Sequence, residues 1–144
     1  MLFGPSPHGL SEIECWHLLS AGGIGRLAVT ISALPRIVPV RFTLDFTLDD
    51  DRVILCLGDQ EELADAVDNT VVVLAVDSLA DDSPHGWLVE VNGIAQLAPA
   101  HDPAPGCPHQ TRPLMASITS ALVSGSTYRL CDGALPATAD RIEP

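Results

Sequence analysis

The sequence predicts a single domain that is mainly β-sheet, of the α+β class, with a few short helices. Runs rich in β-branched residues, separated by Gly and Pro breaks, outnumber segments with helical periodicity. With 144 residues and a hydrophobic fraction of 47%, the chain is long and apolar enough to build a core. We expect one domain over residues 1–144, with an extended lead-in at 1–10, a proline-rich irregular segment at 99–113 and a loose tail at 132–144.

The first expected element is a helix that begins after Ser11. Ser11-Glu12-Ile13-Glu14 is a capping box, in which the Ser11 hydroxyl accepts from the Glu14 N–H and the Glu14 carboxylate reaches back. A 3–4 spacing predicts the stripe that packs on the sheet, namely Ile13, Trp16, His17 and Ser20. Gly22 and Gly23 predict the end of the helix.

A β-hairpin over residues 24–42 is the strongest local prediction. Two β-branched runs flank a break at residues 32–35. In the first run, one face is apolar and consists of Leu27, Val29 and Ile31. In the second run, one face carries Val38, Val40 and Phe42, and the opposite face carries Ile37, Pro39 and Arg41. Because Pro39 cannot donate to a sheet ladder, it indicates an edge, a bend or a bulge. Bulges commonly lie where the backbone turns toward a ligand.

The later elements are mostly strands. Two continuous apolar runs, 53–57 and 71–76, predict strands buried on both faces. Between them, Asp59 is suited to cap a short helix over 60–67. The remaining expected strands are 87–97, interrupted at Asn92-Gly93, and then 115–120 and 124–131, broken near Gly125.

Composition limits the classes of function. The formal net charge is -12, and every basic residue is an arginine. An acidic surface repels phosphate groups, so we expect no binding to nucleic acid or to an anionic membrane surface. The sequence shows neither a signal peptide nor a membrane-spanning segment, which favours a cytoplasmic location.

The cysteines and histidines do not predict a metal site. Cys15, Cys56, Cys107 and Cys131 are scattered without a C-x-x-C pair, and four reduced thiols are expected. His101, Cys107 and His109 share the proline-rich segment but match no standard zinc pattern. No local nucleophile signature is present, so the catalytic residues stay unassigned.

Short motifs in a fixed order carry a resemblance to a known family. They are LSEIEC at 10–15, GRLA at 25–28, PRIVPVRF at 35–42, VD at 76–77, GWLVEVNG at 86–93 and VSG at 123–125. With this order and spacing, residues 10–131 resemble the pyridoxamine 5′-phosphate oxidase-like family of flavin-binding split barrels. The resemblance implies a split β-barrel of six to seven antiparallel strands with two or three short helices. It also implies a homodimer with a small-molecule ligand at the subunit interface.

The resemblance further implies flavin mononucleotide (FMN) or a deazaflavin as cofactor. In the family the flavin ring lies along the strand that corresponds to Pro39-Val40-Arg41-Phe42, and a pattern like Gly-x-x-Thr-Lys-Leu holds the phosphate. Here that place reads Gly58-Asp59-Gln60-Glu61-Glu62-Leu63, so Glu61 replaces the hydroxyl residue and Glu62 the lysine. The residues implied to bind the cofactor are Pro39, Val40, Arg41, Phe42, Leu57, Gln60, Glu61, Glu62 and Trp87.

Two functions therefore stay open. The first is a flavin- or deazaflavin-dependent oxidoreductase with an altered phosphate site. The second is a non-catalytic split-barrel dimer that has lost flavin binding and binds another small ligand or none. Haem is one such ligand, with His17, His85 and His101 as candidate axial ligands. Pyridoxamine phosphate oxidation itself is not expected, because the sequence has no second basic cluster for the substrate phosphate.

The roles of two side chains also stay open. Arg41 either contacts a phosphate or pairs with Glu61 or Glu62 across the cleft. Trp87 either packs in the core or lines the cleft of the partner subunit.

Overall fold

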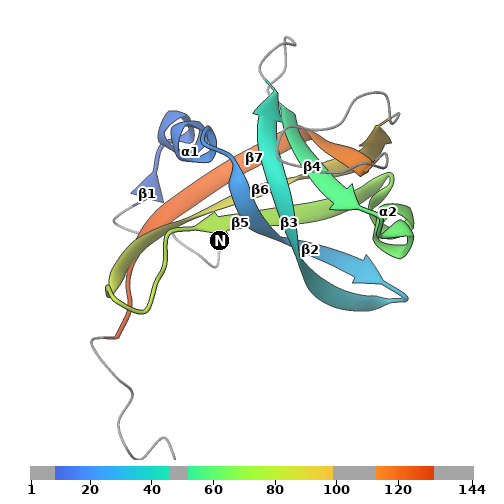
Figure 1. Ribbon diagram of the computed structural model, residues 1–144. Helices are drawn as coiled ribbons and strands as arrows, with labels where there is room; N and C mark the ends of the chain where they lie inside the picture. The colour runs from blue at the N-terminus through green and yellow to red at the C-terminus, as the bar shows by residue number, and fades with distance from the viewer. Residues whose placement is uncertain (1–8, 46–51, 99–112, 132–144) are drawn as a thin grey trace, which may run out of the picture.

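A computed structural model describes residues 9–45, 52–98 and 113–131 of the chain. Within these ranges the elements are β1 (Gly9–Leu10), α1 (Glu12–Leu19), β2 (Gly23–Ile31), β3 (Leu34–Asp45), β4 (Arg52–Gly58), α2 (Glu61–Val67), β5 (Thr70–Asp77), β6 (His85–Ala98) and β7 (Leu114–Arg129). Figure 1 shows long, strongly twisted strands with one short helix on either side. The lead-in before Gly9, the proline-rich segment up to residue 112 and the tail after Cys131 lie outside the described residues.

Six of the strands close into an antiparallel barrel. The sheet order is β1-β7-β4-β3-β2-β5-β6, and an additional pairing of β7 with β6 joins the two ends. The short β1 adds to β7 through the pairs Gly9↔Ser126 and Leu10↔Gly125. The prediction of a mainly β split barrel with short helices is confirmed. The prediction of two separate final strands is wrong, because β7 runs without interruption through Gly125.

The hairpin of β2 and β3 has a tight two-residue turn. Ser32 and Ala33 both have positive φ, 52° and 64°, as a type I′ turn requires. The pairing continues in one register from Ile31↔Leu34 to Gly23↔Phe42. The predicted hairpin is thus confirmed, with a shorter turn than the 32–35 break.

Helix α1 begins as predicted but buries a different face. Ser11 Oγ accepts from the Glu14 N–H at 3.2 Å, and Glu14 Oε1 accepts from the Ser11 N–H at 3.0 Å. The hydrogen bond from the Ser11 N–H to the Glu14 carboxylate lowers the pKa of Glu14, and the Ser11 side chain adds to the effect. Of the predicted stripe only Trp16 packs against the core, and Ile13 is 82% exposed. The fully buried residues of the helix are instead Cys15 and Leu19. Cys15 lies against Gly125, where a Cβ would come within 3.0 Å of its sulfur, so the missing side chain selects this face.

Replacing Ser11 by alanine is expected to reduce the free energy of unfolding by about 1 kcal/mol, because the Glu14 N–H loses its cap. Urea denaturation at pH 7 measures the difference. Ser124→Ala, at an exposed position of β7, is the control and should stay within about 0.5 kcal/mol of the parent. Equal stability of the Ser11 variant and the parent would contradict the role of the cap.

The acidic side of this cap has a predicted pH dependence. The pKa of Glu14 is lower in the folded chain than in the unfolded chain, with the Ser11 backbone N–H as the main cause. Its stabilising contribution is therefore present above the unfolded pKa and is lost as the pH falls through the folded pKa. The stability lost in Glu14→Gln at pH 7 should accordingly shrink toward zero in acid, as urea titrations at several pH values would show.

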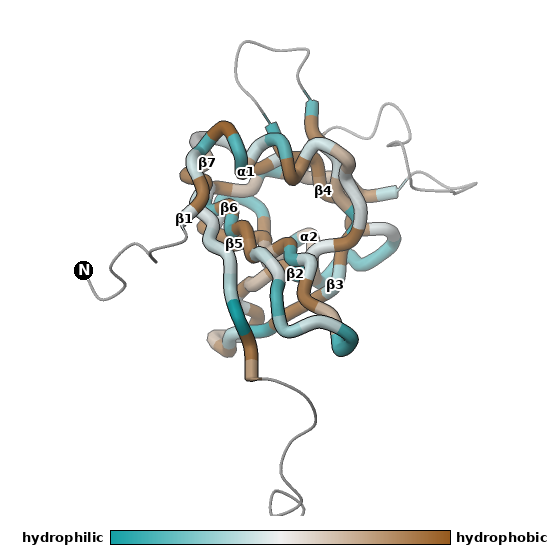
Figure 2. Tube along the Cα trace, turned by 90° about the vertical axis from the view of Figure 1, so that its left-hand side faces the viewer, coloured by the Kyte–Doolittle hydropathy of each residue, from teal (hydrophilic) through white to brown (hydrophobic). Residues whose placement is uncertain are grey.

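The core fills the barrel with alternating side chains. Residues Val53, Leu55 and Leu57 of β4 point inward, as do Val72, Leu74 and Val76 of β5. The prediction that both strands are buried on two faces is wrong, because the intervening residues face outward and Val71 is 71% exposed. Figure 2, which colours the chain by hydropathy, shows hydrophobic residues distributed along the strands of the barrel.

The two helices lie at different ends of the barrel (Figure 1). Helix α2 buries Leu63, Ala64 and Val67. The two residues after α2 form hydrogen bonds with β6. The Asn69 N–H donates to the Ala95 carbonyl at 2.7 Å, and Asp68 Oδ1 accepts from the Leu97 N–H at 3.0 Å. Helix α1 lies instead near Gly125 of β7. The candidate site is at the α2 end.

Candidate functional site

Residues 39–42 of β3, which the resemblance implies lie along the flavin ring and which we call the β3 wall, point to the two faces of the strand in alternation. Val40 and Phe42 are buried in the core, whereas Pro39 and Arg41 are exposed on the outer face of the barrel. Two buried side chains therefore fix the strand from inside and present a proline ring and a guanidinium outward. This agrees with the alternation predicted from the sequence.

One edge of β3 is open beside this wall. Strand β2 pairs with β3 along its whole hairpin, but β4 pairs with β3 only from Arg41↔Cys56 to Asp45↔Arg52. Among the residues that the structure describes, 34–40 therefore have a ladder partner on one side only. Pro39 marks an edge, as one of its three interpretations predicted, and the β2–β3 register shows no bulge there. Backbone groups at such an edge are available to a ligand.

The end of β4 supplies the neighbouring backbone. Leu57 is buried, and Gly58 adopts a positive φ of 64°. A Cβ at Gly58 would meet no atom of the described residues within 4 Å, so the backbone borders open space in this part of the structure. The register of β4 with β7 shifts between Cys56 and Gly58. The irregularity that the sequence suggested at Pro39 thus occurs one strand further on.

The first turn of α2 is acidic and exposed. Asp59, Gln60, Glu61 and Glu62 are all exposed, and the Gln60 side chain makes no capping hydrogen bond. Carboxylates near a helix N-terminus interact favourably with the helix dipole, which accounts for their presence structurally. They also make this end of the site electronegative. A phosphate group placed there would meet repulsion.

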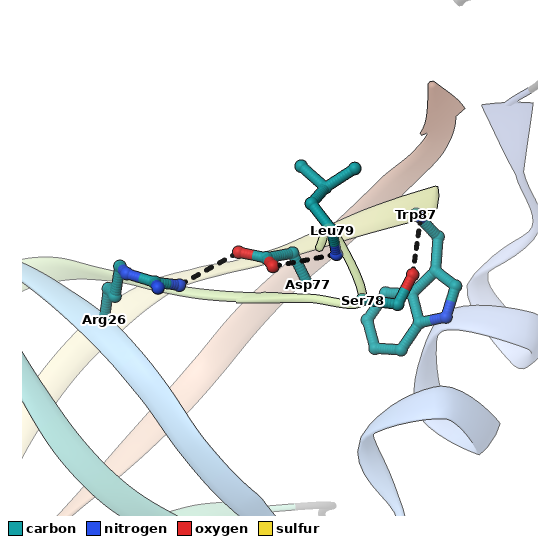
Figure 3. Close-up of polar contacts among 5 residues, drawn as sticks. All are labelled: Arg26, Asp77, Ser78, Leu79 and Trp87. Atoms are coloured by element: carbon teal, nitrogen blue, oxygen red, sulfur yellow. Dashed lines mark hydrogen bonds and ion pairs between the residues drawn. The ribbon is translucent and has the colours of Figure 1, made fainter. Parts of the chain in front are cut away.

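Arg41 does not neutralise these carboxylates. Among the described residues it makes no ion pair with Glu61 or Glu62. An ion pair does form elsewhere on the outer face, where Arg26 Nη1 lies 3.0 Å from Asp77 Oδ2 (Figure 3). Of the two roles left open for Arg41, the internal pair is therefore absent from the described part of the chain, and the guanidinium faces solvent.

Trp87 lies away from the other candidate residues. Its backbone N–H donates to Ser78 Oγ at 2.9 Å (Figure 3). Its backbone carbonyl accepts from the Ser78 N–H at 3.0 Å. The half-buried side chain packs against the core. Pro39 and Arg41 are by contrast exposed on the outer face of the barrel. Within one chain Trp87 therefore packs in the core and does not line that outer face.

The cysteines differ from the expected set of reduced thiols. Cys15 and Cys131 are free, but Cys56 is disulfide-bonded. Cys107 lies outside the described residues. Burial raises the pKa of the Cys15 thiol, and the neighbouring Glu14 and Glu12 add to the effect. Cys15 is thus held in its unreactive thiol form.

The described residues also limit other classes of site. No group of three or more His, Cys, Asp or Glu side chains among the described residues is placed to hold a metal ion. A pocket of about 270 Å³ lies between the 80–84 loop and the end of β7, and not at β3. No helix within the described ranges has the length and apolarity to cross a membrane.

Comparison with known proteins identifies the family. Residues 11–104 match the sequence pattern of the pyridoxamine 5′-phosphate oxidase family. The chain belongs to this family. The matched region includes the whole candidate site, from the hairpin through α2 and β6. No curated protein matches the chain.

Solved structures share the fold of this family member. An FAD-binding protein from Mycobacterium smegmatis is 22% identical with a TM-score of 0.66, covering 85% of this chain and 99% of its own. An FAD-binding protein from Mesorhizobium loti is 21% identical with a TM-score of 0.58, covering 83% and 96%. A flavocytochrome from Azotobacter vinelandii is 13% identical with a TM-score of 0.59, covering 94% and 76%.

Proposed function

We propose that this protein binds a flavin, FMN or a deazaflavin relative, on the outer wall of β3 and acts as a flavin-dependent oxidoreductase. We also propose that it works as a homodimer with the ligand at the subunit interface. The observation that carries the proposal is the exposed Pro39–Arg41 face beside an open strand edge, in a chain of the pyridoxamine 5′-phosphate oxidase family. The FAD-binding proteins of the same fold support it.

The ring portion of a flavin fits the residues present. The exposed Pro39 offers an apolar surface for an aromatic ring, while Val40 and Phe42 hold the strand rigid from inside. The open edge of residues 34–40 offers backbone donors and acceptors to the polar rim of the ring. When bound, the flavin supplies the hydride chemistry, and the chain contributes binding, orientation and exclusion of water.

The phosphate of FMN does not fit the first turn of α2. Glu61 and Glu62 are exposed there, and Asp59 precedes them. Two like unit charges ~4 Å apart repel by about 4 kcal/mol at an effective dielectric of 20, although solvent exposure reduces this figure. Arg41 is the cation that β3 itself places on the outer face. We infer that a phosphorylated flavin directs its phosphate toward Arg41 and away from α2.

The ultraviolet-visible spectrum of protein purified from cells tests the proposal. A flavin or deazaflavin absorption band is expected, together with a thermal shift when riboflavin, FMN or FAD is added to stripped protein. An Arg41→Gln variant should lose more affinity for FMN than for riboflavin, because riboflavin has no phosphate. Colourless protein that shows no thermal shift with any of the three would refute flavin binding.

A non-catalytic binding protein is the second candidate. The acidic first turn of α2 favours it, since Glu61 and Glu62 occupy the place where a phosphate grip is expected. Haem is one possible ligand class, and a flavocytochrome has the same fold. His17 and His85 are exposed, whereas His101 lies outside the described residues. A Soret band in the purified protein would favour haem over flavin.

A further inference from the structure

The backbone of β3 bonds to β2 at every second residue. Ile31↔Leu34 closes the two-residue turn of the hairpin. The pair that closes such a turn is hydrogen-bonded, and in an antiparallel ladder every second pair beyond it is hydrogen-bonded as well. The even-numbered residues of β3 therefore bond to β2, whereas the backbone groups of Pro35, Ile37 and Pro39 point to the opposite side. We call that side of these three residues the free edge.

The ladder between β3 and β4 agrees with this assignment. It begins at Arg41↔Cys56, and Arg41 is the next odd-numbered residue after Pro39. Among the described residues, the same side of β3 is thus paired from Arg41 onward and unpaired before it. An unpaired side of this kind is a template on which a strand of another chain can add.

Two of the three residues on the free edge are prolines. A proline nitrogen carries no hydrogen, so of these three residues Ile37 alone has an N–H, while all three have carbonyl acceptors. A strand that paired with the free edge would therefore leave two of its own carbonyls without a donor. Prolines on edge strands are one means by which natural sheets prevent such pairing.

We propose that Pro35 and Pro39 close the free edge to β-strands of other chains and reserve it for small molecules. The other residues of the segment favour strand addition, since Ile37 is 72% exposed, Leu34 is 63% exposed and Val38 adds a further β-branched side chain. A small molecule needs no continuous row of donors. The free edge fits a compact ligand that accepts one hydrogen bond, from the Ile37 N–H, and donates others to the carbonyls.

The free edge adjoins the β3 wall, because Pro39 belongs to both. A strand added to the free edge would cover the backbone beside the wall, where the proposed flavin needs access. Strand addition itself does not require flavin. It is therefore measurable in flavin-free protein, whether or not the proposed function holds.

Amide hydrogen exchange of the full chain without flavin tests whether the free edge is unpaired. The Ile37 N–H is expected to exchange at least tenfold faster than the N–H groups of Arg36 and Val38, because these two bond to β2. Equal protection of the three amides would overturn the proposal, since another segment would then already cover the edge.

Replacing Pro35 and Pro39 by threonine restores both missing donors and is expected to make the chain self-associate. Sedimentation velocity at micromolar concentration should show assemblies of at least twice the mass of the parent, and the Ile37 N–H should become protected. Ile37→Thr is the matched control, because it places a threonine on the same edge without adding an N–H. This variant should keep the mass of the parent.

A second variant shows whether the backbone causes the association. Adding Ile37→Pro to the double variant removes the donor between the two threonines and should return the mass to that of the parent. A folded double variant with the parent's mass would overturn the proposal, as would an association that Ile37→Pro leaves unchanged. Should the double variant not fold, Pro35→Thr and Pro39→Thr alone are expected to associate more weakly, and the parent's mass in both would overturn the proposal equally. Flavin absorbance of the parent reports separately on the proposed function.

Discussion

Replacing Gly93 by valine is expected to reduce the free energy of unfolding by about 3 kcal/mol or more. A Cβ at this position would lie 2.6 Å from Ile118 Cγ2 and 2.8 Å from the carbonyl oxygen of Thr119. Ile118 is fully buried, and Thr119 belongs to the facing strand β7. Neither atom moves aside without disturbing the closure of the barrel. Since a domain is typically stable by only ~5–15 kcal/mol, the variant loses much of its stability.

Urea denaturation and thermal unfolding of Gly93→Val measure this loss. The matched control is Ser124→Val, which adds the same side chain to an exposed position of β7 and should change stability by less than about 0.5 kcal/mol. A Gly93→Val chain with the unfolding midpoint of the parent would show that β6 and β7 do not approach as closely as this structure has them.

Local chemistry explains which elements were predictable. The capping box of Ser11 and Glu14 and the hairpin turn depend on residues a few positions apart, and both formed where expected. The interruption expected at Asn92-Gly93 coincides with a shift in the β6–β7 register between Asn92 and Ile94. These features follow from backbone sterics and nearby hydrogen bonds, which the sequence displays directly.

Which side chains are buried depends on the closure of the barrel, and closure is set by pairing between strands that are distant in the sequence. The runs at 53–57 and 71–76 are continuously apolar, so their pattern alone did not distinguish two buried faces from one. The pairing of β6 with β7 closes the barrel and assigns an inside and an outside to every strand. Val71 is consequently left exposed despite its apolar neighbours. The helix stripe failed for a similar reason, because Gly125, more than a hundred residues away, selects the face carrying Cys15.

The candidate site was predictable only in part. The resemblance located the β3 wall and the acidic α2 turn, and the structure places them at the end of adjacent strands, since Arg41 pairs with Cys56 just before Gly58. It also grouped Trp87 with them, whereas within one chain Trp87 packs against the core. The open space beside Gly58 depends on its positive φ and had no sequence signal beyond the glycine itself.

Substituting Glu61→Thr together with Glu62→Lys is expected to increase the affinity for FMN at low ionic strength at least tenfold. The pair removes two carboxylates from the exposed first turn of α2 and adds one ammonium group and a hydroxyl. Tenfold corresponds to about 1.4 kcal/mol, a modest fraction of the unscreened interaction of about 4 kcal/mol. Fluorescence titration of FMN with the protein measures the change.

Salt and ligand comparisons isolate the electrostatic cause of that gain. The advantage should shrink as salt is added, because exposed charges are screened within about 10 Å at 0.1 M. Asp81→Thr with Asp82→Lys makes the same charge change on an exposed loop and should leave FMN affinity within threefold of the parent. Riboflavin lacks the phosphate and should bind the parent and the α2 variant alike. If the α2 variant gains as much affinity for riboflavin as for FMN, Glu61 and Glu62 act on the binding of the ring. If its affinity for FMN is unchanged, the two carboxylates do not restrict the site at all.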